Sequence, residues 1–457
     1  MILNIVIILS IIFISLKIEK LYKIASPLTL IILSIGTGML FPEFLSFTNT
    51  AVFSEEMLVF IVLLVLGDAF ILKLKDLKEI FVSIIYLAVV SVAIAIILGA
   101  LSKFLIFPDM NIGIGALIAL FAMVTATDPV SVVAVFNQYK LPHKLKILAE
   151  GESLFNDAMA LTLFSAFGLF LMNEHNEMTF AYASIVSLEI FIGSTIIGLL
   201  IGMIGLVFLK GTKDLLGEFV LILLVAYGAF LAAEHIHIIG HNHLSGLLSE
   251  IVAVLTMTTL IDKSYELDKK RFNQEKNIIN KISSDSKKHK NYRTKKLLNN
   301  FISDITDIKR QDDIYRFINV ISLLANGVLF VSLAHIINFN NLELYWKEIL
   351  MVFGITTVIR SLLIGVFALI SHKTKYIPNI DFKWYSVLMF AGIKGGLSIV
   401  MLHMLNIAFP DFQYKEMFES IVIGVILLST FIYVPLMMVT IKLNKKEFIQ
   451  ELENEKH

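Results

Sequence analysis

The apolar run at residues 111–137 reads NIGIGALIALFAMVTATDPVSVVAVFN. Its length suits a membrane-spanning helix, because about 20 mostly apolar residues cross the hydrocarbon core. Thr127-Asp128-Pro129 stands in the middle of this run. Pro129 removes a backbone donor and clashes with the preceding turn, so the helix is expected to break there. A simple proline kink is the other interpretation, and the neighbouring carboxylate argues against it, since charged groups inside a membrane usually mark a pathway or a pair.

A second apolar run, residues 384–407, is interrupted at a matching depth by Gly392-Ile393-Lys394-Gly395-Gly396. Three glycines in five residues loosen a helix. The two runs come from opposite halves of the chain and are expected to cross the membrane in opposite directions. Two interrupted helices in corresponding positions indicate a transporter with inverted repeats.

The composition indicates a membrane protein. Of 457 residues, 57% are hydrophobic and 17% are charged, and the mean hydropathy is +0.81. Soluble domains are about 45–50% apolar and about 25% charged. The chain has no cysteine, which excludes disulfides and thiolate metal sites. No phosphate-binding loop of a nucleotide-driven pump occurs, no feature favours nucleic-acid binding, and the chain is not expected to be an enzyme.

Thirteen apolar runs predict an all-α polytopic fold, at residues 2–17, 26–41, 54–72, 79–106, 111–137, 148–172, 180–209, 217–236, 242–261, 314–338, 347–371, 384–407 and 416–441. The chain then divides into helices one to nine at 1–261 with core helices at 79–172, a polar cytoplasmic loop at 262–313, helices ten to thirteen at 314–443, and a short tail at 444–457.

The distribution of positive charge predicts the orientation. With the C-terminus in the cytoplasm and the N-terminus outside, 33 Lys and Arg residues fall in inner segments and 3 in outer ones. Cytoplasmic loops are the ones that carry an excess of Lys and Arg. The composition, rich in Ile, Lys and Asn, favours a prokaryotic cytoplasmic membrane.

Four ionisable residues are expected at one depth near the middle of the membrane: Asp128, Asp157, Arg360 and Lys394. A charge at the bilayer centre costs about 2.5–3.5 kcal/mol on the insertion scale. Two buried salt bridges that only hold helices together are one interpretation. Two such pairs at one level are an expensive way to join helices, and a transport pathway is therefore favoured.

The sixth run supplies the side chains for a cation site. Ser153 and Asp157 are four residues apart and share one helical face, and Glu152 and Asn156 share the adjoining face. Together with Asp128 and Thr127, these oxygens would surround a partly dehydrated Na+, K+ or Li+. Without thiolate or paired His at this depth, a transition metal is not expected. The prediction is a Na+ site at Asp157 and Asp128, with transported cation and proton and no cofactor.

Other polar features have two interpretations each. The outer connection with Glu234 and His235 contains four His, which suits zinc or external pH sensing, or simply interfacial packing. Glu250 is a pathway or dimer-interface acid, or a member of a buried structural pair. The loop 262–313 contacts anionic membrane lipid or a cytoplasmic regulator, or is a solvated linker.

At these motifs the chain resembles the sodium/proton exchangers of the bacterial NhaP type and the animal NHE type. The matching stretches are Thr127-Asp128-Pro129, Glu152-Ser153-Leu154-Phe155-Asn156-Asp157, Ala233-Glu234-His235, Ser245-Gly246, Arg360 and Gly392-Ile393-Lys394-Gly395-Gly396-Leu397-Ser398. The first two motifs together are highly specific. The resemblance implies a thirteen-helix inverted-repeat antiporter fold with two broken crossing helices, and a homodimer.

The resemblance also implies roles for individual residues. Asp157 binds cation and proton in turn, and Asp128, Ser153 and the carbonyl of Thr127 complete the site. Asn156 stands where electrogenic relatives have a second Asp, which implies electroneutral exchange. Glu152 would be paired with an arginine.

Two departures from the family pattern leave questions open. Lys394 replaces a common Arg, and a buried Lys gives up its proton more readily than Arg, which leaves an electrogenic cycle open. Asp68 is the nearest candidate for an acid that many relatives place late in helix three.

The sequence therefore predicts a secondary antiporter that exchanges a monovalent cation for H+ by alternating access. A cation channel or a transport-inactive sensor on the same fold is the alternative. A carboxylate-type symporter is disfavoured, because two midplane acids would repel its substrate.

Overall fold

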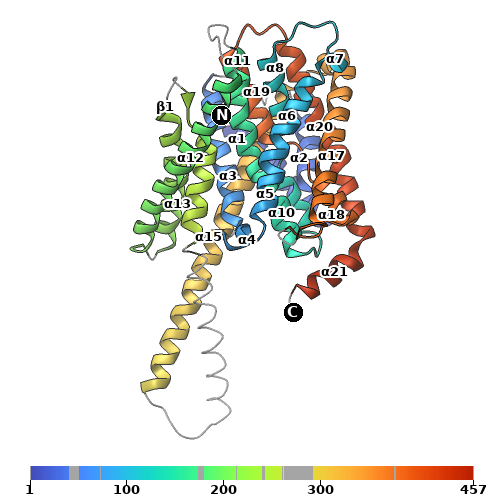
Figure 1. The fold of residues 1–457 in the computed structure, drawn as a ribbon. Coiled ribbons are helices and arrows are strands. Elements are labelled where there is room, and N and C mark those ends of the chain that lie inside the picture. The colour runs from blue at the N-terminus through green and yellow to red at the C-terminus, as the bar shows by residue number, and fades with distance from the viewer. Residues whose placement is uncertain are drawn as a thin grey trace.

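The computed structural model describes residues 2–40, 51–72, 74–172, 180–212, 214–238, 242–259, 261, 292–374 and 377–455. Regular structure in this part of the chain is helical, apart from one antiparallel pair of two-residue strands, β1 (His237–Ile238) and β2 (Asn242–His243). The helices form one bundle, with the two chain ends at opposite ends of it (Figure 1).

The helices of the first half are α1 (Ile2–Tyr22), α2 (Ser26–Leu40), α3 (Ala51–Ile71), α4 (Leu74–Glu79), α5 (Phe81–Ile84), the π-helix η2 (Ile85–Val90), α6 (Ser91–Leu101), α7 (Lys103–Ile106), α8 (Ile114–Thr125), α9 (Pro129–Phe136), α10 (His143–Leu163), the π-helix η3 (Phe164–Leu169), α11 (Phe170–Met172), α12 (Phe180–Leu209) and α13 (Leu215–His235). The second half contributes the helix Gly246–Thr259, α15 (Tyr292–Ile336), α16 (Phe339–Leu344), α17 (Trp346–Ser371), α18 (Phe382–Phe390), α19 (Gly396–Ala408), α20 (Lys415–Leu443) and α21 (Lys445–Asn454).

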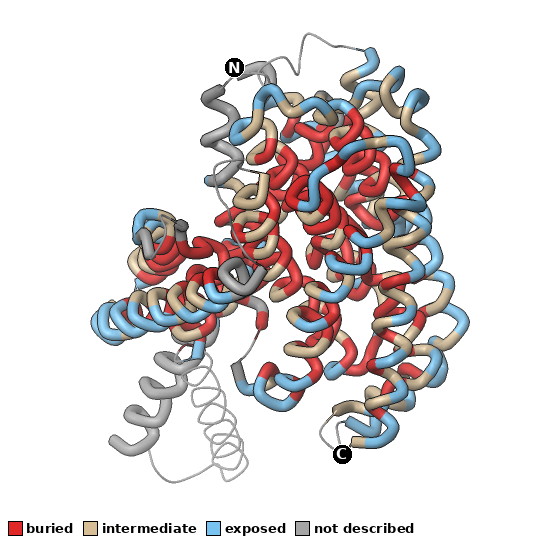
Figure 2. Tube along the Cα trace, turned by 45° about the horizontal axis from the view of Figure 1, so that its top comes forward, coloured by how far each residue is buried: buried red, intermediate tan, exposed pale blue. Residues whose placement is uncertain are grey.

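Each predicted apolar run overlaps one helix or several consecutive helices. Among the described residues, eight helices are long and apolar enough to cross a membrane, and four shorter apolar helices accompany them. Large apolar side chains face outward, such as Phe208 and Leu224, which are 63% and 66% exposed. Buried positions lie between the helices and exposed ones on their outer sides (Figure 2). The chain is therefore an all-α integral membrane protein, while the count of thirteen crossings stays a prediction.

Both predicted helix breaks are present. The run 111–137 divides into α8, which ends at Thr125, and α9, which begins at Pro129. The run 384–407 divides into α18, which ends at Phe390, and α19, which begins at Gly396. The two interruptions touch, because the backbone N–H of Asp128 donates a 2.8 Å hydrogen bond to the carbonyl of Ile393.

The helices pack in two groups. In residues 81–172 and 346–443, here called the core, α8 packs on α6 and η3, α10 on η2, and α17 and α18 on α20. In residues 2–71, 180–259 and 292–336, here called the scaffold, α15 packs along α2 and α3, and α12 along α13. The site lies in the core, and α15 reaches it from the scaffold through contacts with α19.

Two polar segments are more ordered than hydropathy indicates. Helix α15 begins at Tyr292, well before the start at 314 that the apolar run predicts, and projects from one end of the bundle (Figure 1). The rest of the predicted loop, 262–291, lies outside the described residues. The predicted tail forms α21, whose Phe448 is buried and whose Glu447 bonds to Lys383 at 2.9 Å. This helix packs because one of its faces is apolar.

Two glycines of α12 allow close packing on the helix Gly246–Thr259. A β-carbon at Gly202 would lie 2.7 Å from the carbonyl oxygen of Ala253. One turn earlier, a β-carbon at Gly198 would collide with the carbonyl oxygen of Ser249. Membrane helices depend on such small residues, since lipid provides no hydrophobic drive for their association.

We expect Gly202→Ala to destabilise the protein by about 1–3 kcal/mol, because the new methyl group meets backbone that cannot rotate away. Gly228 in α13 is the matched control, since a β-carbon there meets nothing within 4 Å. Gly228→Ala should be neutral or stabilising by up to about 1 kcal/mol. Thermal unfolding in detergent compares the two variants, and equal midpoints would contradict the packing account.

Candidate functional site

Asp128 stands at the first break and caps the second half-helix. One of its carboxylate oxygens accepts a 3.1 Å hydrogen bond from the backbone N–H of Val130, and the other accepts from the hydroxyl of Ser131. Pro129 occupies the first helical position, where its fixed φ is suited and its missing donor is not needed. A carboxylate at a helix N-terminus is favourable, because the aligned peptide dipoles place partial positive charge there.

Helix α10 joins the break through two adjacent side chains. Asp157 accepts a 2.9 Å hydrogen bond at Oδ1 from the backbone N–H of Thr127. The amide of Asn156 donates to Thr127 Oγ1 at 2.9 Å and to the carbonyl of Thr125 at 3.3 Å. The unwound segment is thus held against α10, and the Asp157 carboxylate is aimed at it.

Lys394 compensates the end of the first half-helix. Its Nζ donates a 2.9 Å hydrogen bond to the carbonyl of Thr125, the last residue of α8. The side chain is only 6% exposed. A cation at a helix C-terminus balances the partial negative charge of the free carbonyls. Lys394 therefore bonds to a backbone carbonyl, not to a carboxylate.

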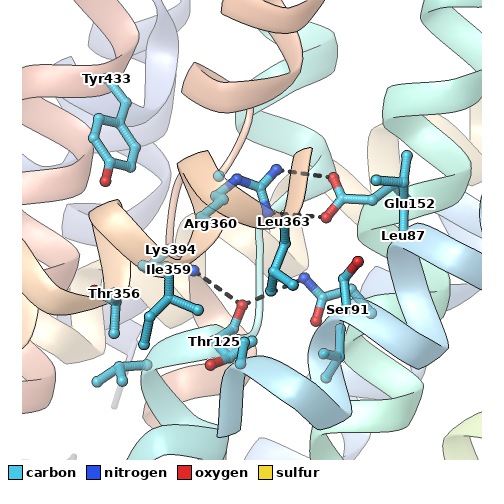
Figure 3. A pocket seen from close by; sticks show the side chains of 15 residues that line it. Leu87, Ser91, Thr125, Glu152, Thr356, Ile359, Arg360, Leu363, Lys394 and Tyr433 are labelled. Carbon is cyan, nitrogen blue, oxygen red and sulfur yellow. Dashed lines mark hydrogen bonds and ion pairs between the residues drawn. The ribbon is translucent and has the colours of Figure 1, made fainter. Parts of the chain in front are cut away.

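Arg360 of α17 caps the C-terminal end of α18, as Lys394 caps the end of α8. Its guanidinium donates to the carbonyls of Leu388 and Met389 at 2.9 and 3.3 Å. It also forms a two-pronged pair with Glu152, at 3.0 and 3.1 Å (Figure 3). The resemblance implies an arginine partner for Glu152, and the structure places Arg360 in that position. Both cations expected at this depth cap a helix end, and of the two only Arg360 also pairs with a carboxylate in the described part of the chain.

The glycines of the second break allow close approach as well as unwinding. A β-carbon at Gly395 would collide with the side chain of Asp128. One at Gly392 would lie 2.5 Å from Nε of Arg360. One at Gly396 would lie 2.7 Å from Leu329 of α15. Gly392 and Gly395 therefore bring the chain of the second break against two of the four charged residues.

Beside Asp157, two buried oxygens have no hydrogen-bond partner among the described residues, Ser153 Oγ and Asn156 Oδ1. Ser153 is fully buried and Asn156 is 1% exposed. Buried polar atoms almost always have a partner, and each exception requires an explanation. A small hard cation between these oxygens and Asp157 would satisfy both of them.

Cavities approach the site from two sides. One of about 440 Å³ is lined by Asp68, Val130 and Arg316, among others. Another of about 230 Å³ is lined by Leu161, Thr162 and Glu234, among others. Val130 is two residues from Asp128, and Leu161 is one helical turn beyond Asp157.

The four accessory candidates have different surroundings. Asp68 is 8% exposed and lies within electrostatic range of Asp128 and Asp157. Glu234 accepts a 3.2 Å hydrogen bond from the backbone N–H of Gly246 and so caps that helix.

His235 Nδ1 bonds to the carbonyl of Leu231 in its own helix, and Glu250 is fully buried. Neither Glu250 oxygen has a hydrogen-bond partner in the described part of the chain. The interpretation of Glu250 as part of a buried pair finds no partner there.

Sequence reasoning missed two neutral residues at the site, Ser429 and Asn326, and quoted a third, Ser398, only as part of a motif and without a role. Ser429 accepts from the backbone N–H of Lys394 at 3.1 Å, and Ser398 donates to the carbonyl of Met123 at 2.7 Å. Asn326 of α15 lies beside the Asp128 side chain. The available signal was a polar residue inside an apolar run. Serine is so common in spanning helices that this signal did not single them out.

The Glu152–Arg360 pair is expected to matter for stability. Glu152→Gln should cost about 3–5 kcal/mol, since it leaves a buried guanidinium without its countercharge. Combining it with Arg360→Gln should recover part of that loss. Glu447→Gln removes an exposed partner of Lys383 and should change stability by about 0–1 kcal/mol. Unfolding midpoints measure all three, and a double variant no more stable than Glu152→Gln alone would contradict the pairing.

Comparison with known proteins finds relatives that are named as Na(+)/H(+) antiporters. They include the Na(+)/H(+) antiporter NhaG of Bacillus atrophaeus, 28% identical over 305 residues, which are 66% of this chain and 48% of that protein. ApNhaP of Aphanothece halophytica is 27% identical over 400 residues, 85% of this chain and 65% of that protein. NhaH of Halobacillus aidingensis is 24% identical over 425 residues, 90% of each chain. The chain thus spans about half of NhaG and under two thirds of ApNhaP.

A solved structure shares the fold. The sodium proton antiporter MjNhaP1 from Methanocaldococcus jannaschii at pH 8 superimposes with a TM-score of 0.65 over 98% of this chain and 99% of that one, at 19% identity. The family model described as "Sodium/hydrogen exchanger, transmembrane" matches residues 5–258, which is more than half of the sequence. On that match, the chain belongs to the sodium/hydrogen exchanger family.

Proposed function

We propose that this protein exchanges a monovalent cation, Na+ foremost and K+ or Li+ as close alternatives, for protons across a membrane. The observation that carries the proposal is the Asp157 carboxylate beside two unpartnered buried oxygens at the meeting point of two broken helices. The relatives named above as Na(+)/H(+) antiporters support it.

Asp157 is the carboxylate best placed to change partners. Glu152 is held by Arg360, and both oxygens of Asp128 cap α9. Asp157 accepts one backbone hydrogen bond and forms no ion pair in the described part of the chain. Its charge is therefore available to a proton or to a cation, and binding of one excludes the other. Competition for one group couples the two fluxes.

The proposed cation ligands are Asp157, Asp128, Ser153, Thr127 and Asn156. Asn156 contributes a neutral amide next to Asp157, so one titrating carboxylate serves each transported cation. One proton against one monovalent cation makes the exchange electroneutral. Lys394 is engaged with Thr125, which supports a structural role for it over proton transfer.

Two cavities, one lined by Val130 and the other by Leu161, support alternating access. In the proposed cycle, the core moves against the scaffold and exposes Asp157 first to one cavity and then to the other. The empty, charged site crosses the barrier reluctantly, because moving a bare carboxylate into a low-dielectric region is costly. This reluctance distinguishes an exchanger from a channel of the same fold.

The proposal extends to assembly and placement. The scaffold is the surface proposed for a homodimer within membrane lipid, in the cytoplasmic membrane of a prokaryote. The excess of Lys and Arg supports a cytoplasmic C-terminus and an external N-terminus. The segment 262–313 remains the proposed contact for a cytoplasmic regulator.

Asp157→Asn is expected to abolish exchange while the protein still folds, because the amide is nearly isosteric and cannot carry a proton or compensate a cation. Proteoliposomes with an imposed pH gradient and an internal pH dye measure the response to Na+, K+ and Li+. Asp109→Asn, at an exposed loop residue, is the matched control and should exchange like the wild type. Retained exchange in Asp157→Asn would refute the assignment.

Competition also predicts how exchange depends on pH. Lowering the pH on the cation side should raise the apparent KM for the cation and leave the rate at saturating cation nearly unchanged, because protons and cations occupy one site. Adding Na+ to purified protein in weak buffer should release protons, and Asp157→Asn should release none. A pH effect confined to the maximal rate, with constant KM, would argue against a shared site.

A further inference from the structure

Asn326 is a polar residue deep within the apolar part of α15. Its side chain is 1% exposed, and its Oδ1 has no hydrogen-bond partner among the described residues. Leaving a buried carbonyl oxygen unpaired costs about 1–3 kcal/mol relative to a satisfied one. An apolar residue of similar volume would avoid that cost, so the amide requires an explanation beyond packing.

The amide of Asn326 faces the site. It lies beside the side chain of Asp128, whose two oxygens accept from Val130 and Ser131. Both of those donors belong to the core, as Asp128 does. Asn326 belongs to the scaffold, and its amide therefore joins the two helix groups at the site itself.

A stripe of α15 leads from the cavity to this amide. Arg316, Asn319 and Ser322 line the cavity that approaches Asp128. Asn319, Ser322 and Asn326 are three and four residues apart and so lie on one face of the helix. Ser322 already donates its hydroxyl to the carbonyl of Leu64 at 3.2 Å. The deepest side chain of this stripe is thus Asn326, one turn beyond the cavity lining, with a free oxygen.

The geometry points to Asn326 as a further cation ligand, supplied by the scaffold to a site otherwise built by the core. The amide lies beside Asp128, and its oxygen, which has no partner among the described residues, is available to a cation held between Asp128 and Asp157. This inference rests on the proposed function and refines it. The neutral amide oxygen of Asn326 would then contribute to the selection among Na+, K+ and Li+.

A neutral ligand tunes selectivity without changing the charge balance. Hard alkali cations bind carboxylate, carbonyl and hydroxyl oxygens. Each added oxygen replaces one water of the hydration shell, and the gain depends on cation size. Because Asn326 stands on α15, this oxygen is present only while the site faces the cavity that α15 lines. The cation would be bound with one ligand more on that side than on the other.

The test uses the purified full-length chain and two measurements. Cation-dependent thermal stabilisation measures binding without transport, since a ligand that binds the folded state raises the unfolding midpoint. Proteoliposome exchange measures KM and maximal rate separately. The variants are Asn326→Leu, which removes the amide, and Asn326→Asp, which keeps an oxygen. The control is Ser332→Ala, which removes another buried polar group of α15, one that donates only to Leu329 of its own helix.

We expect Asn326→Leu to weaken apparent cation affinity by about threefold to tenfold, the loss of one neutral contact. The effect should differ between Na+, K+ and Li+, and the maximal rate should fall less than the affinity. Asn326→Asp should bind cations more tightly than the wild type, because it adds a carboxylate oxygen at the ligand position. Ser332→Ala should leave affinity and ion order unchanged.

Unchanged cation affinity and ion order in both Asn326 variants would overturn the inference, as would an equal loss in Ser332→Ala. If Asn326→Leu does not fold, Asn326→Asp decides alone, because a ligand position must respond to added charge. A wild type that is stabilised by cations but does not exchange them would refute the proposed function and still test Asn326. A wild type that binds no monovalent cation would refute both.

Discussion

Two interrupted helices meet at a backbone hydrogen bond from Asp128 to Ile393, and the site depends on this crossing. A helix broken inside lipid exposes donors and acceptors that no solvent can satisfy, so the protein must satisfy them internally. Lys394 donates a hydrogen bond to the carbonyl of Thr125 at the C-terminal end of α8. Arg360 donates to the carbonyls of Leu388 and Met389 at the C-terminal end of α18. Asp128 accepts a hydrogen bond from the backbone N–H of Val130 at the N-terminal end of α9. Lys394, Arg360 and Asp128 therefore serve first to hydrogen-bond the backbone groups that the two helix breaks leave unpaired.

This compensation separates the carboxylates by role. Glu152 is neutralised by a two-pronged arginine pair, and Asp128 is occupied by the donors of its own half-helix. Asp157 is oriented by one amide and has no counter-ion in the described part of the chain. Three acids and two bases in a small volume thus leave one carboxylate, Asp157, whose charge is free to be matched by a proton or a metal cation. The proposed competition requires this difference, in which Asp157 lacks the partners that occupy Glu152 and Asp128.

Packing determines what can move. Close approaches at Gly198 and Gly202 of α12 hold scaffold helices together without intervening side chains. Within the core, Gly392 and Gly395 bring the second break against Arg360 and Asp128. At the site, Asn326 is a polar residue of the scaffold that lies beside the core residue Asp128. Cavities reach Val130 on one side and Leu161 on the other. A small displacement of core against scaffold would therefore change which side reaches Asp157.

From the sequence by itself, hydropathy determined that lipid surrounds the chain and which class of fold it forms, and the placement of charge predicted where the candidate site lies. Hydropathy marks the spans because lipid excludes unpaired polar groups, and Pro129 and the glycines at 392–396 mark the breaks for local backbone reasons. The rarity of charge in such runs singled out Asp128, Asp157, Arg360 and Lys394. Tertiary structure alone decided how these residues pair, since side chains far apart in sequence meet only after packing. It joined Arg360 to Glu152, sent Lys394 to a carbonyl, and brought Asn326 from another helix group to Asp128. A neutral polar residue in an apolar helix carries little signal in sequence, because its importance lies in the partner that the fold places beside it.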